Sequence, residues 1–412
     1  MDRQKFWKVV GKPLVENDRI FGTRIFSPLL KFIRLFIMLY LQTKFYKNYA
    51  NIGKWKDKLV ANTFAPPVGS KPQFRALKNL VKSQLSGHAF PVAMTFAVTY
   101  RCQLNCKHCS AGKHIKKNDK ELTTEEAKRL IDESQKLGIT ILAFTGGEPL
   151  LREDIFELIS YVDTEKTMPM MFTNGQFLTK ENVQKLADAG LYSLFLSVDS
   201  PFPEEHDELR GMDGLFKTGL EGLKEAKSKG IFVGFSSYAS YTNTQKEYYK
   251  KLHKLAKENG IQNIILFDCV PTGNMLHDES ELLTSELRNK IYEYSSEVFR
   301  KKEIPPLSSQ AWQTSDEAYL SGIGCLAGNI QYYVSAYGEV APCDFTPISF
   351  GNIRKEPLKN IWHRMVSHPA YDHRSAFCRM QNPKFRNCYI DPIPDEATLP
   401  YSITKLPHVD YR

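Results

Sequence analysis

Short apolar runs alternate with amphipathic stretches through the middle of the chain. Six of these runs read as β-strands, at residues 91–99, 140–144, 168–173, 192–198, 231–238 and 263–268. In the stretches between them, apolar positions three or four residues apart predict helices that start at Thr123 and cover 153–162, 179–189, 215–229 and 245–259. Thr123 and Glu126 have the spacing of a capping box. Six such repeats predict an α/β fold with a parallel sheet, shorter than a full eightfold β/α barrel.

The first 90 residues do not share this alternation. Residues 25–41 are strongly apolar but contain Lys31 and Arg34, and several lysines follow them. A membrane-spanning helix needs about 20 mostly apolar residues, so this run is typical of a helix that lies in the membrane interface. A helix packed on the protein's own surface is the alternative. Residues 62–73 contain two prolines and a glycine and read as a linker.

The net charge of +9 is unevenly distributed along the chain. Residues 1–90 contain 17 Lys and Arg against 4 Asp and Glu, which is +13, so the remaining residues carry −4. This asymmetry predicts an anionic partner for the N-terminal segment alone. We expect that partner to be an anionic membrane surface. We expect no nucleic acid, because the basic residues form no recognisable nucleic-acid-binding module.

Seven of the eight cysteines fall into two groups. Cys102, Cys106 and Cys109 follow the first strand in a C-x3-C-x2-C pattern. Three closely spaced thiolates suit a cubane iron–sulfur cluster, in which each thiolate binds one iron and the fourth iron keeps an open position. A zinc site that lacks one ligand, or three ordinary thiols, are the alternatives. Grouped cysteines and the absence of a signal-peptide pattern predict a cytoplasmic protein. Peripheral attachment to the inner face of the membrane is a further expectation.

Polar or glycine residues follow the next three strands. They are Gly146, Gly147 and Glu148 after the second strand, Asn174 after the third, and Ser197 and Asp199 after the fourth. The carboxyl ends of parallel strands meet at one edge, and ligands bind there. We therefore expect these residues and the cysteine loop to converge on one end of the barrel.

The cysteine loop, followed one helix later by the Gly-Gly-Glu-Pro sequence at 146–149, resembles the radical S-adenosylmethionine (SAM) superfamily. The resemblance implies a partial (β/α)6 barrel that is open on one side. It implies a [4Fe-4S] cluster on the three cysteines and SAM bound to the open iron, with His108 near the adenine. The SAM-binding residues implied are Gly146, Gly147, Glu148, Asn174, Ser197, Asp199 and Arg210, the last of these pairing with the SAM carboxylate.

The resemblance also implies an enzyme and its chemistry. The reduced cluster donates one electron to SAM, which splits into methionine and a 5′-deoxyadenosyl radical. This radical abstracts a hydrogen atom from an unactivated C–H position, so we expect an oxidoreductase or transferase of the radical SAM type. A reductase, ferredoxin or flavodoxin supplies the electron. A non-catalytic iron–sulfur or nucleic-acid-binding protein is the alternative from another class, and the complete cysteine triad together with Glu148 argues against it.

A second cysteine set lies in the C-terminal third, at Cys325, Cys343, Cys378 and Cys388. The first half of this pattern resembles the SPASM/twitch extension of radical SAM enzymes, which binds auxiliary iron–sulfur clusters. The second half departs from it, because a full SPASM domain has a denser cysteine run. Four cysteines suffice for one fully ligated cube, so we predict one auxiliary [4Fe-4S] cluster. A zinc site is the alternative.

These observations predict the domain organisation and leave the substrate open. The domains expected are a basic amphipathic helical extension at 1–90, a radical SAM partial barrel at 91–270, a helical linker at 271–320, a small SPASM/twitch-like cluster domain at 321–395 and a tail at 396–412. The N-terminal segment suggests a lipid or membrane-associated substrate. Maturation of a peptide or protein, as in peptide natural products or sulfatases, and modification of a tetrapyrrole side chain are the alternatives. The sequence gives no prediction of oligomeric state.

Overall fold

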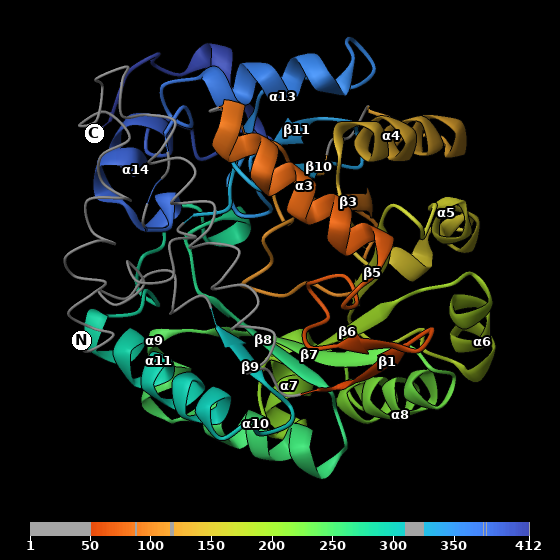
Figure 1. The fold of residues 1–412 in the computed structure, drawn as a ribbon. Helices are drawn as coiled ribbons and strands as arrows, with labels where there is room; N and C mark the ends of the chain where they lie inside the picture. Colours follow the sequence, from red (N-terminus) through yellow and green to blue (C-terminus); the bar gives the residue numbers. More distant parts are fainter. Residues whose placement is uncertain are drawn as a thin grey trace, which may run out of the picture.

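The computed structural model describes residues 51–86, 89–115, 119–309, 325–373, 375 and 377–411. Its centre is a sheet in the order β11-β10-β3-β4-β5-β6-β7-β8-β9 (Figure 1). Strands β3 to β8 are parallel throughout. Their bounds are Ala93–Thr99, Ile141–Gly146, Met168–Thr173, Ser193–Ser197, Phe232–Ala239 and Asn263–Asp268. These are the six strands that the sequence predicts, and the α/β barrel class is confirmed.

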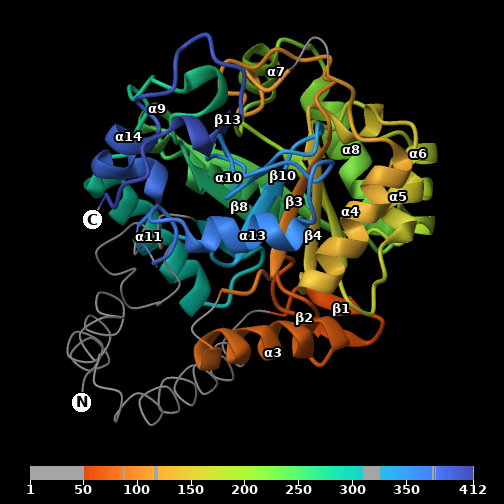
Figure 2. The same cartoon turned by 90° about the horizontal axis from the view of Figure 1, so that it is seen from above.

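Helices connect these strands and cover the outer face of the sheet (Figure 2). They are α4 (Thr124–Leu137), α5 (Ile155–Tyr161), α6 (Lys180–Asp188), α7 (Pro203–Arg210), α8 (Leu215–Ser228), α9 (Tyr241–Gln245) and α10 (Tyr248–Glu258). The capping box at Thr123 and Glu126 is present at the start of α4. The apolar side of each helix packs on the outward side chains of the strands in one large core, because burying that side removes apolar surface from water.

A β-hairpin and a helix close the barrel at the N-terminal ends of its strands. The hairpin consists of β1 (Gly53–Trp55) and β2 (Lys58–Val60), which pair antiparallel, and Trp55 packs on Tyr192 with ring centroids 5.1 Å apart. Lys56 and Asp57 both have positive φ, as a two-residue hairpin turn requires. The sequence predicted a helical segment for residues 1–90, so this hairpin was not expected.

Helix α3 (Lys71–Ser86) is the one helix among residues 51–86, and it starts inside the stretch that reads as a linker. Its Asn79 Nδ2 donates to the Gly138 carbonyl, 2.8 Å away, just before β4. In Figure 2, α3 and the hairpin lie at one end of the barrel and α7 at the other. The apolar run at 25–41 lies outside the described residues. None of the described helices is long and apolar enough to cross a bilayer.

The C-terminal third extends the same sheet. Strand β9 (Leu307–Ser309) pairs with β8, and β10 (Gln331–Val334) pairs with β3, both in parallel. The remaining elements are η2 (Gly273–Met275), α11 (Ser285–Arg300), β11 (Val340–Ala341), β12 (Ile348–Ser349), α13 (Leu358–Ser367), η4 (Arg379–Gln381), α14 (Pro383–Tyr389), β13 (Tyr401–Ser402) and η5 (Ile403–Lys405). The end of the chain is also packed, since β13 pairs with β12 and Tyr411 is buried.

Candidate functional site

The first cysteine group lies in a loop at the carboxyl end of β3. Each thiol is free, and each has its pKa raised by burial, that of Cys106 to about 11. The thiols of Cys102 and Cys109 raise the pKa of Cys106 further, which places the three side chains together. In the described ranges no three Cys, His, Asp or Glu side chains are spaced as ligands of one metal ion. Three thiols in one short loop suit a cluster in which each binds a different iron.

The Gly-Gly-Glu turn after β4 packs directly on the backbone that leads into this loop. Gly147 N donates to the Thr99 carbonyl at 2.8 Å, and Glu148 N donates to the Arg101 carbonyl at 2.9 Å. A Cβ atom on Gly146 would meet the Thr99 carbonyl oxygen at 2.1 Å, and one on Gly147 would meet that of Arg101 at 2.3 Å. Only glycine allows this approach, so the turn and the cysteine loop form one unit.

Glu148 carries a fully buried carboxylate beneath that unit. It accepts hydrogen bonds from Thr173 Oγ1 at 2.9 Å, Asn174 N at 2.8 Å and Leu150 N at 3.1 Å. Burial raises the pKa of Glu148 above its ordinary value, and these donors offset part of that rise. Asn174 is 5% exposed, and its buried Nδ2 makes no hydrogen bond of normal geometry in the described part of the chain, although its side chain lies close enough to the Cys102 thiol to lower the pKa of that thiol. A donor left in this state is a candidate ligand contact.

Asp199 and Arg210 form a buried ion pair beside the cysteine loop. Arg210 Nε and Nη2 donate to the two carboxylate oxygens at 2.7 and 3.0 Å, and His108 Nε2 lies 3.1 Å from Asp199 Oδ2. Burial alone would raise the pKa of Asp199, but Arg210 and His108 hold it well below its usual range. The positive charge of Arg210 also lowers the pKa of Cys106. The family resemblance implies that Arg210 pairs with the SAM carboxylate. In the structure, two of its nitrogens donate to Asp199.

His108, which the family resemblance puts near the adenine of SAM, packs against a tyrosine ring in the structure. The His108 and Tyr238 rings are 4.6 Å apart. Beside them, a small hollow of about 10 Å³ is lined by residues that include Asp199, Tyr238, Asn243 and Tyr248. This hollow adjoins the ends of β6 and β7, where polar residues at strand ends predicted a ligand.

The interior of the barrel is accessible near the same end. Thr145, Phe172, Ser197, Tyr238 and Phe267 are partly exposed, whereas most of their neighbours along β4 to β8 are buried. These residues lie on the strand face that points into the barrel, because they continue the alternation of the inner cluster. The inward side chains are therefore fully buried near the hairpin and partly exposed near the cysteine loop.

The structure brings three cysteines of the second set together. Cys325 and Cys343 are 7% and 8% exposed, and burial raises the pKa of Cys343 to about 12. Burial, and then the charges of Cys325 and Cys343, raise the pKa of Cys378 well above its usual value. Cys388 lies in α14 and is not among the groups that act most strongly on these thiols.

Arg379 is the cation beside this second set. It is 1% exposed, and its guanidinium lies 4.8 Å from the Tyr371 ring centroid. Burial lowers the pKa of Arg379, but the charge of the nearby Cys325 raises it. A buried guanidinium stabilises neighbouring thiolates. Thr346 Oγ1 lies 3.2 Å from the Cys343 sulfur. The sequence gave no reason to select Arg379, because it directly follows a cysteine in an otherwise ordinary polar stretch.

A buried tyrosine pair lies between the two cysteine groups. The hydroxyls of Tyr100 and Tyr333 are 2.6 Å apart, and His114 Nδ1 lies 3.2 Å from the Tyr100 hydroxyl. Tyr100 precedes the cysteine loop, while Tyr333 belongs to β10 of the C-terminal module. Pairing of β10 with β3 creates this contact, which is why the sequence did not reveal it.

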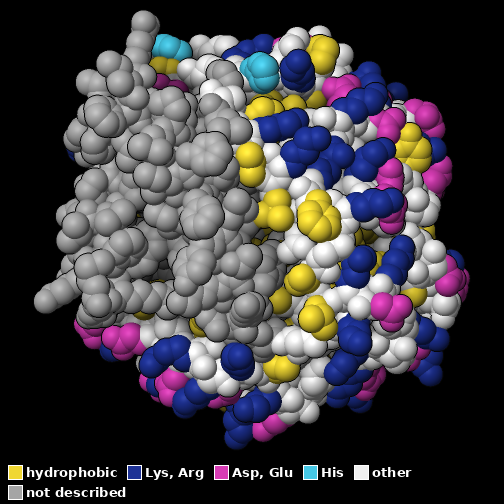
Figure 3. Space-filling view, viewed as in Figure 1, with side chains coloured by type: hydrophobic (Ala, Val, Ile, Leu, Met, Phe, Trp, Pro, Cys, Tyr) yellow, Lys and Arg dark blue, Asp and Glu magenta, His cyan; other side chains and the backbone are white. Residues whose placement is uncertain are grey.

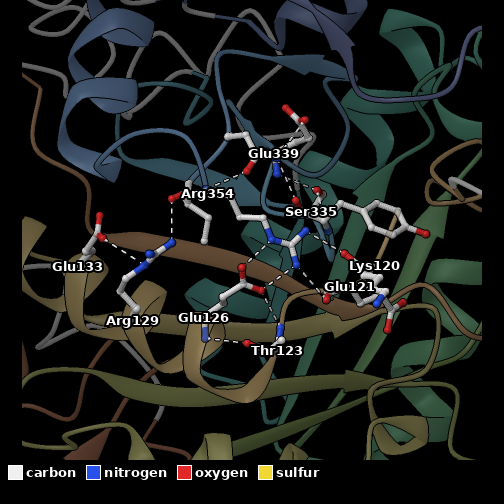
Figure 4. A network of polar contacts seen from close by, with 12 residues as sticks. Lys120, Glu121, Thr123, Glu126, Arg129, Glu133, Ser335, Glu339 and Arg354 are labelled. Carbon is white, nitrogen blue, oxygen red and sulfur yellow. Dashed lines mark hydrogen bonds and ion pairs between the residues drawn. The ribbon is translucent and has the colours of Figure 1, made fainter. Parts of the chain in front are cut away.

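A polar network joins the C-terminal module to the base of the cysteine loop (Figure 4). Arg354 Nε and Nη2 each donate to the Glu126 carboxylate at 2.7 Å, and its guanidinium also donates to the carbonyls of Lys120 and Glu121. The Glu121 carboxylate accepts from Thr99 Oγ1 at 2.9 Å and from Tyr100 N at 2.7 Å. Arg354 thus fixes the segment that anchors the first residues of the loop.

Known proteins are similar to the chain in both modules. The family model described as "Radical SAM superfamily" matches residues 96–243, and the one described as "Iron-sulfur cluster-binding domain" matches residues 325–389. An AdoMet-dependent heme synthase of Methanosarcina barkeri is 33% identical over 290 residues, covering 66% of this chain and 82% of that protein. An Fe-coproporphyrin III synthase of the same organism is 28% identical over 310 residues, covering 68% and 75%.

A solved structure shows the same fold. Streptococcus suis SuiB bound to S-adenosylmethionine superposes with a TM-score of 0.55 at 18% identity, over 70% of this chain and 71% of SuiB. At this identity the likeness concerns the fold alone.

Proposed function

Because this chain belongs to the radical SAM superfamily and carries a C-terminal SPASM domain, we propose that it modifies a tetrapyrrole side chain by hydrogen-atom abstraction. The chain is an enzyme of this superfamily and uses a [4Fe-4S] cluster, SAM, auxiliary iron–sulfur chemistry and an external reductant. The observation that carries the tetrapyrrole proposal is the 33% identity with a heme synthase over 82% of that protein's length.

The residues at the carboxyl end of the barrel fit the cofactors. Cys102, Cys106 and Cys109 would hold three irons, and the fourth iron would remain open for SAM. The bound cluster and SAM together supply a 5′-deoxyadenosyl radical. We assign SAM binding to the surrounding residues Gly146, Gly147, Glu148, Asn174, Ser197, Asp199 and Arg210.

The protein's own part in this chemistry is to position the reactants. Asn174 Nδ2 is a buried donor available to a polar atom of SAM. Glu148 holds the Asn174 backbone in place through a 2.8 Å hydrogen bond. Asp199 fixes Arg210 beside the thiols, where the Arg210 charge lowers the pKa of Cys106 and so favours its ionised, metal-binding form, while the Asp199 charge acts in the opposite direction.

The auxiliary site is proposed on the C-terminal module. Cys325, Cys343 and Cys378 would each bind an iron of one auxiliary cluster, and the Tyr100–Tyr333 pair lies between this site and the first. We leave Cys388, the fourth ligand predicted from the sequence, outside this set, because it is not among the groups that act most strongly on Cys343 and Cys378. We propose the domain limits given by the sequence, with one revision: residues 51–86 form a cap on the barrel, and the tail from 396 packs with the C-terminal module.

Partly exposed aromatic rings near the cysteine loop end of the barrel support a flat substrate. The Phe172 and Phe267 rings are 6.4 Å apart, and Phe267 lies 5.6 Å from Phe345 of the C-terminal module. All three rings are partly exposed, and such rings offer stacking surface to a planar macrocycle. The sequence favoured a lipid substrate, but the similar proteins act on tetrapyrroles by name, so the tetrapyrrole alternative takes first place.

The proposal is tested with iron-reconstituted protein under anaerobic conditions. Fe-coproporphyrin III, SAM and dithionite are incubated with the protein, and the porphyrin products and 5′-deoxyadenosine are measured by mass spectrometry. We expect a mass change on the porphyrin together with 5′-deoxyadenosine, and neither with a Cys102→Ala, Cys106→Ala, Cys109→Ala variant. If 5′-deoxyadenosine forms while the porphyrin stays unchanged, the tetrapyrrole proposal is wrong and a peptide substrate becomes the better one.

A further inference from the structure

The barrel end opposite the cysteine loop is both basic and apolar. The exposed side chains of the hairpin and α3 that make up this basic face are Lys54, Lys56, Lys58, Leu59, Lys71, Phe74, Lys78 and Lys82. Figure 3, which views this end of the barrel, shows hydrophobic side chains set among many Lys and Arg side chains. Residues 51–86 contain seven Lys and Arg against a single acid, Asp57.

The helical spacing places part of this set on one side of α3. Lys71, Phe74, Lys78 and Lys82 are separated by three or four residues and share one helix face. The buried side of the helix, about 100° around the axis from this row, carries Asn79, which docks α3 on the barrel. The outward face of α3 is therefore the one that carries the cations.

Little of this charge is neutralised within the molecule. Lys71 pairs with Glu165 at 2.6 Å, and within the described part of the chain the other five lysines of the basic face form no ion pair. Phe74 is 62% exposed and Leu59 is 45% exposed. Phe74 sits between Lys71 and Lys78 in the helical row, so the face offers both a charged and an apolar contact.

We propose that the basic face docks on the surface of an anionic lipid bilayer. Exposed lysines attract anionic headgroups, and aromatic or leucine side chains at the centre of such a face enter the interface. The chain outside the structure ends at residue 50, directly before the hairpin, and its apolar run at 25–41 with basic residues around it continues the same chemistry. The apolar components favour a bilayer over nucleic acid.

Docking in this way fixes how the enzyme faces the membrane. The hairpin and α3 contact residues that precede the strands, such as Tyr192 and Gly138, whereas the cysteine loop follows the strand ends. Seven residues of β3 separate the two levels, which is about 20 Å of extended strand. The cysteine loop therefore faces the aqueous side, and the inference does not depend on which substrate is used.

The test is flotation of the full-length, iron-reconstituted protein with vesicles. Phosphatidylglycerol-containing vesicles are compared with pure phosphatidylcholine vesicles at low and high salt. We expect binding to the anionic vesicles alone, and a Lys54→Glu, Lys78→Glu, Lys82→Glu variant to lower the partition coefficient by about tenfold or more. A matched variant, Lys217→Glu, Lys224→Glu, Lys254→Glu, reverses exposed lysines on α8 and α10 and should keep most of the binding.

The apolar contact has its own readout. Phe74→Ser leaves the charge unchanged and should weaken the binding that persists at high salt, since salt screens only the electrostatic part. Iron content and circular dichroism show that each variant is folded. The proposal is overturned if wild-type protein does not float, if both triple variants lose binding equally, or if single-stranded RNA displaces the protein from the vesicles through the same lysines.

Discussion

Arg210 binds Asp199 through two parallel hydrogen bonds, with Nε 2.7 Å from Oδ2 and Nη2 3.0 Å from Oδ1. Asp199 follows β6, and Arg210 is the last residue of α7. Both side chains are at most 10% exposed. The pair therefore ties the end of a strand to the end of its following helix, beside the loop that carries Cys102, Cys106 and Cys109.

Breaking this pair should destabilise the fold. Asp199→Asn leaves the Arg210 charge buried without its counter-ion, so we expect the free energy of unfolding to fall by about 3 kcal/mol. Urea denaturation of the anaerobic protein measures this loss. As a control, Glu181→Gln breaks the exposed pair with Lys185, which should cost about 0.5 kcal/mol or less. Equal losses in the two variants would contradict the role given to the buried pair.

Glu148 should control SAM binding without holding the cluster. Glu148→Gln places an amide NH2 where the carboxylate accepts from Thr173 and Asn174, so the Asn174 loop should shift. We expect the iron content to remain unchanged and the affinity for SAM to fall about tenfold or more, the cost of a lost charged hydrogen bond. The change that SAM causes in the electron paramagnetic resonance spectrum of the reduced cluster reports this affinity. An unchanged SAM titration would remove Glu148 from the site.

The Arg354–Glu126 pair should make stability depend on acid. Arg354 lowers the pKa of Glu126 from 4.5 to about 2. A carboxyl whose pKa is lower in the folded state stabilises the protein above pH 4.5, and this stabilisation is lost as the pH falls toward 2. Arg354→Leu should therefore cost about 1 kcal/mol at pH 7 and less at pH 3. Denaturation curves at both pH values test this, and a cost that is independent of pH would contradict it.

The ligands of the auxiliary cluster can be separated by iron analysis. Cys378 interacts with Cys325 and Cys343, whereas Cys388 is not among the charges that act most strongly on them. We expect Cys378→Ser to reduce the iron content from about eight to about four atoms per chain, and Cys388→Ser to retain about eight. Mössbauer spectroscopy identifies which cluster remains. Loss of four irons in the Cys388→Ser variant would restore it as a ligand.

Periodicity was sufficient to predict the barrel. The six strands contain continuous apolar runs because both faces of a parallel sheet are covered, and Thr123 with Glu126 marks α4 correctly. The hairpin at 53–60 was missed because two three-residue strands give too short an alternation to separate from an irregular basic segment. Its Lys56-Asp57 turn lacks the glycine that usually signals such a connection.

Motif spacing predicted the cysteine loop, the glycine turn and Asp199, because local sequence fixes these positions. Contacts between distant segments were not predictable in the same way. Tyr333 reaches Tyr100, and Arg354 reaches Glu126, only because β10 joins the edge of the barrel sheet at β3. No periodicity within either segment specifies that pairing. The ion pair between Arg210 and Asp199 is a further example, because a single sequence does not show which anionic group an arginine binds.

In the reaction that we propose, the radical formed at the cysteine loop removes a hydrogen atom from a tetrapyrrole side chain. The most direct measurement uses Fe-coproporphyrin III deuterated on its propionate side chains, with reconstituted protein, SAM and a reductant under anaerobic conditions. We expect 5′-deoxyadenosine that carries one deuterium atom, with matching loss of deuterium from the porphyrin. Unlabelled 5′-deoxyadenosine formed at the same rate with and without the porphyrin would contradict it.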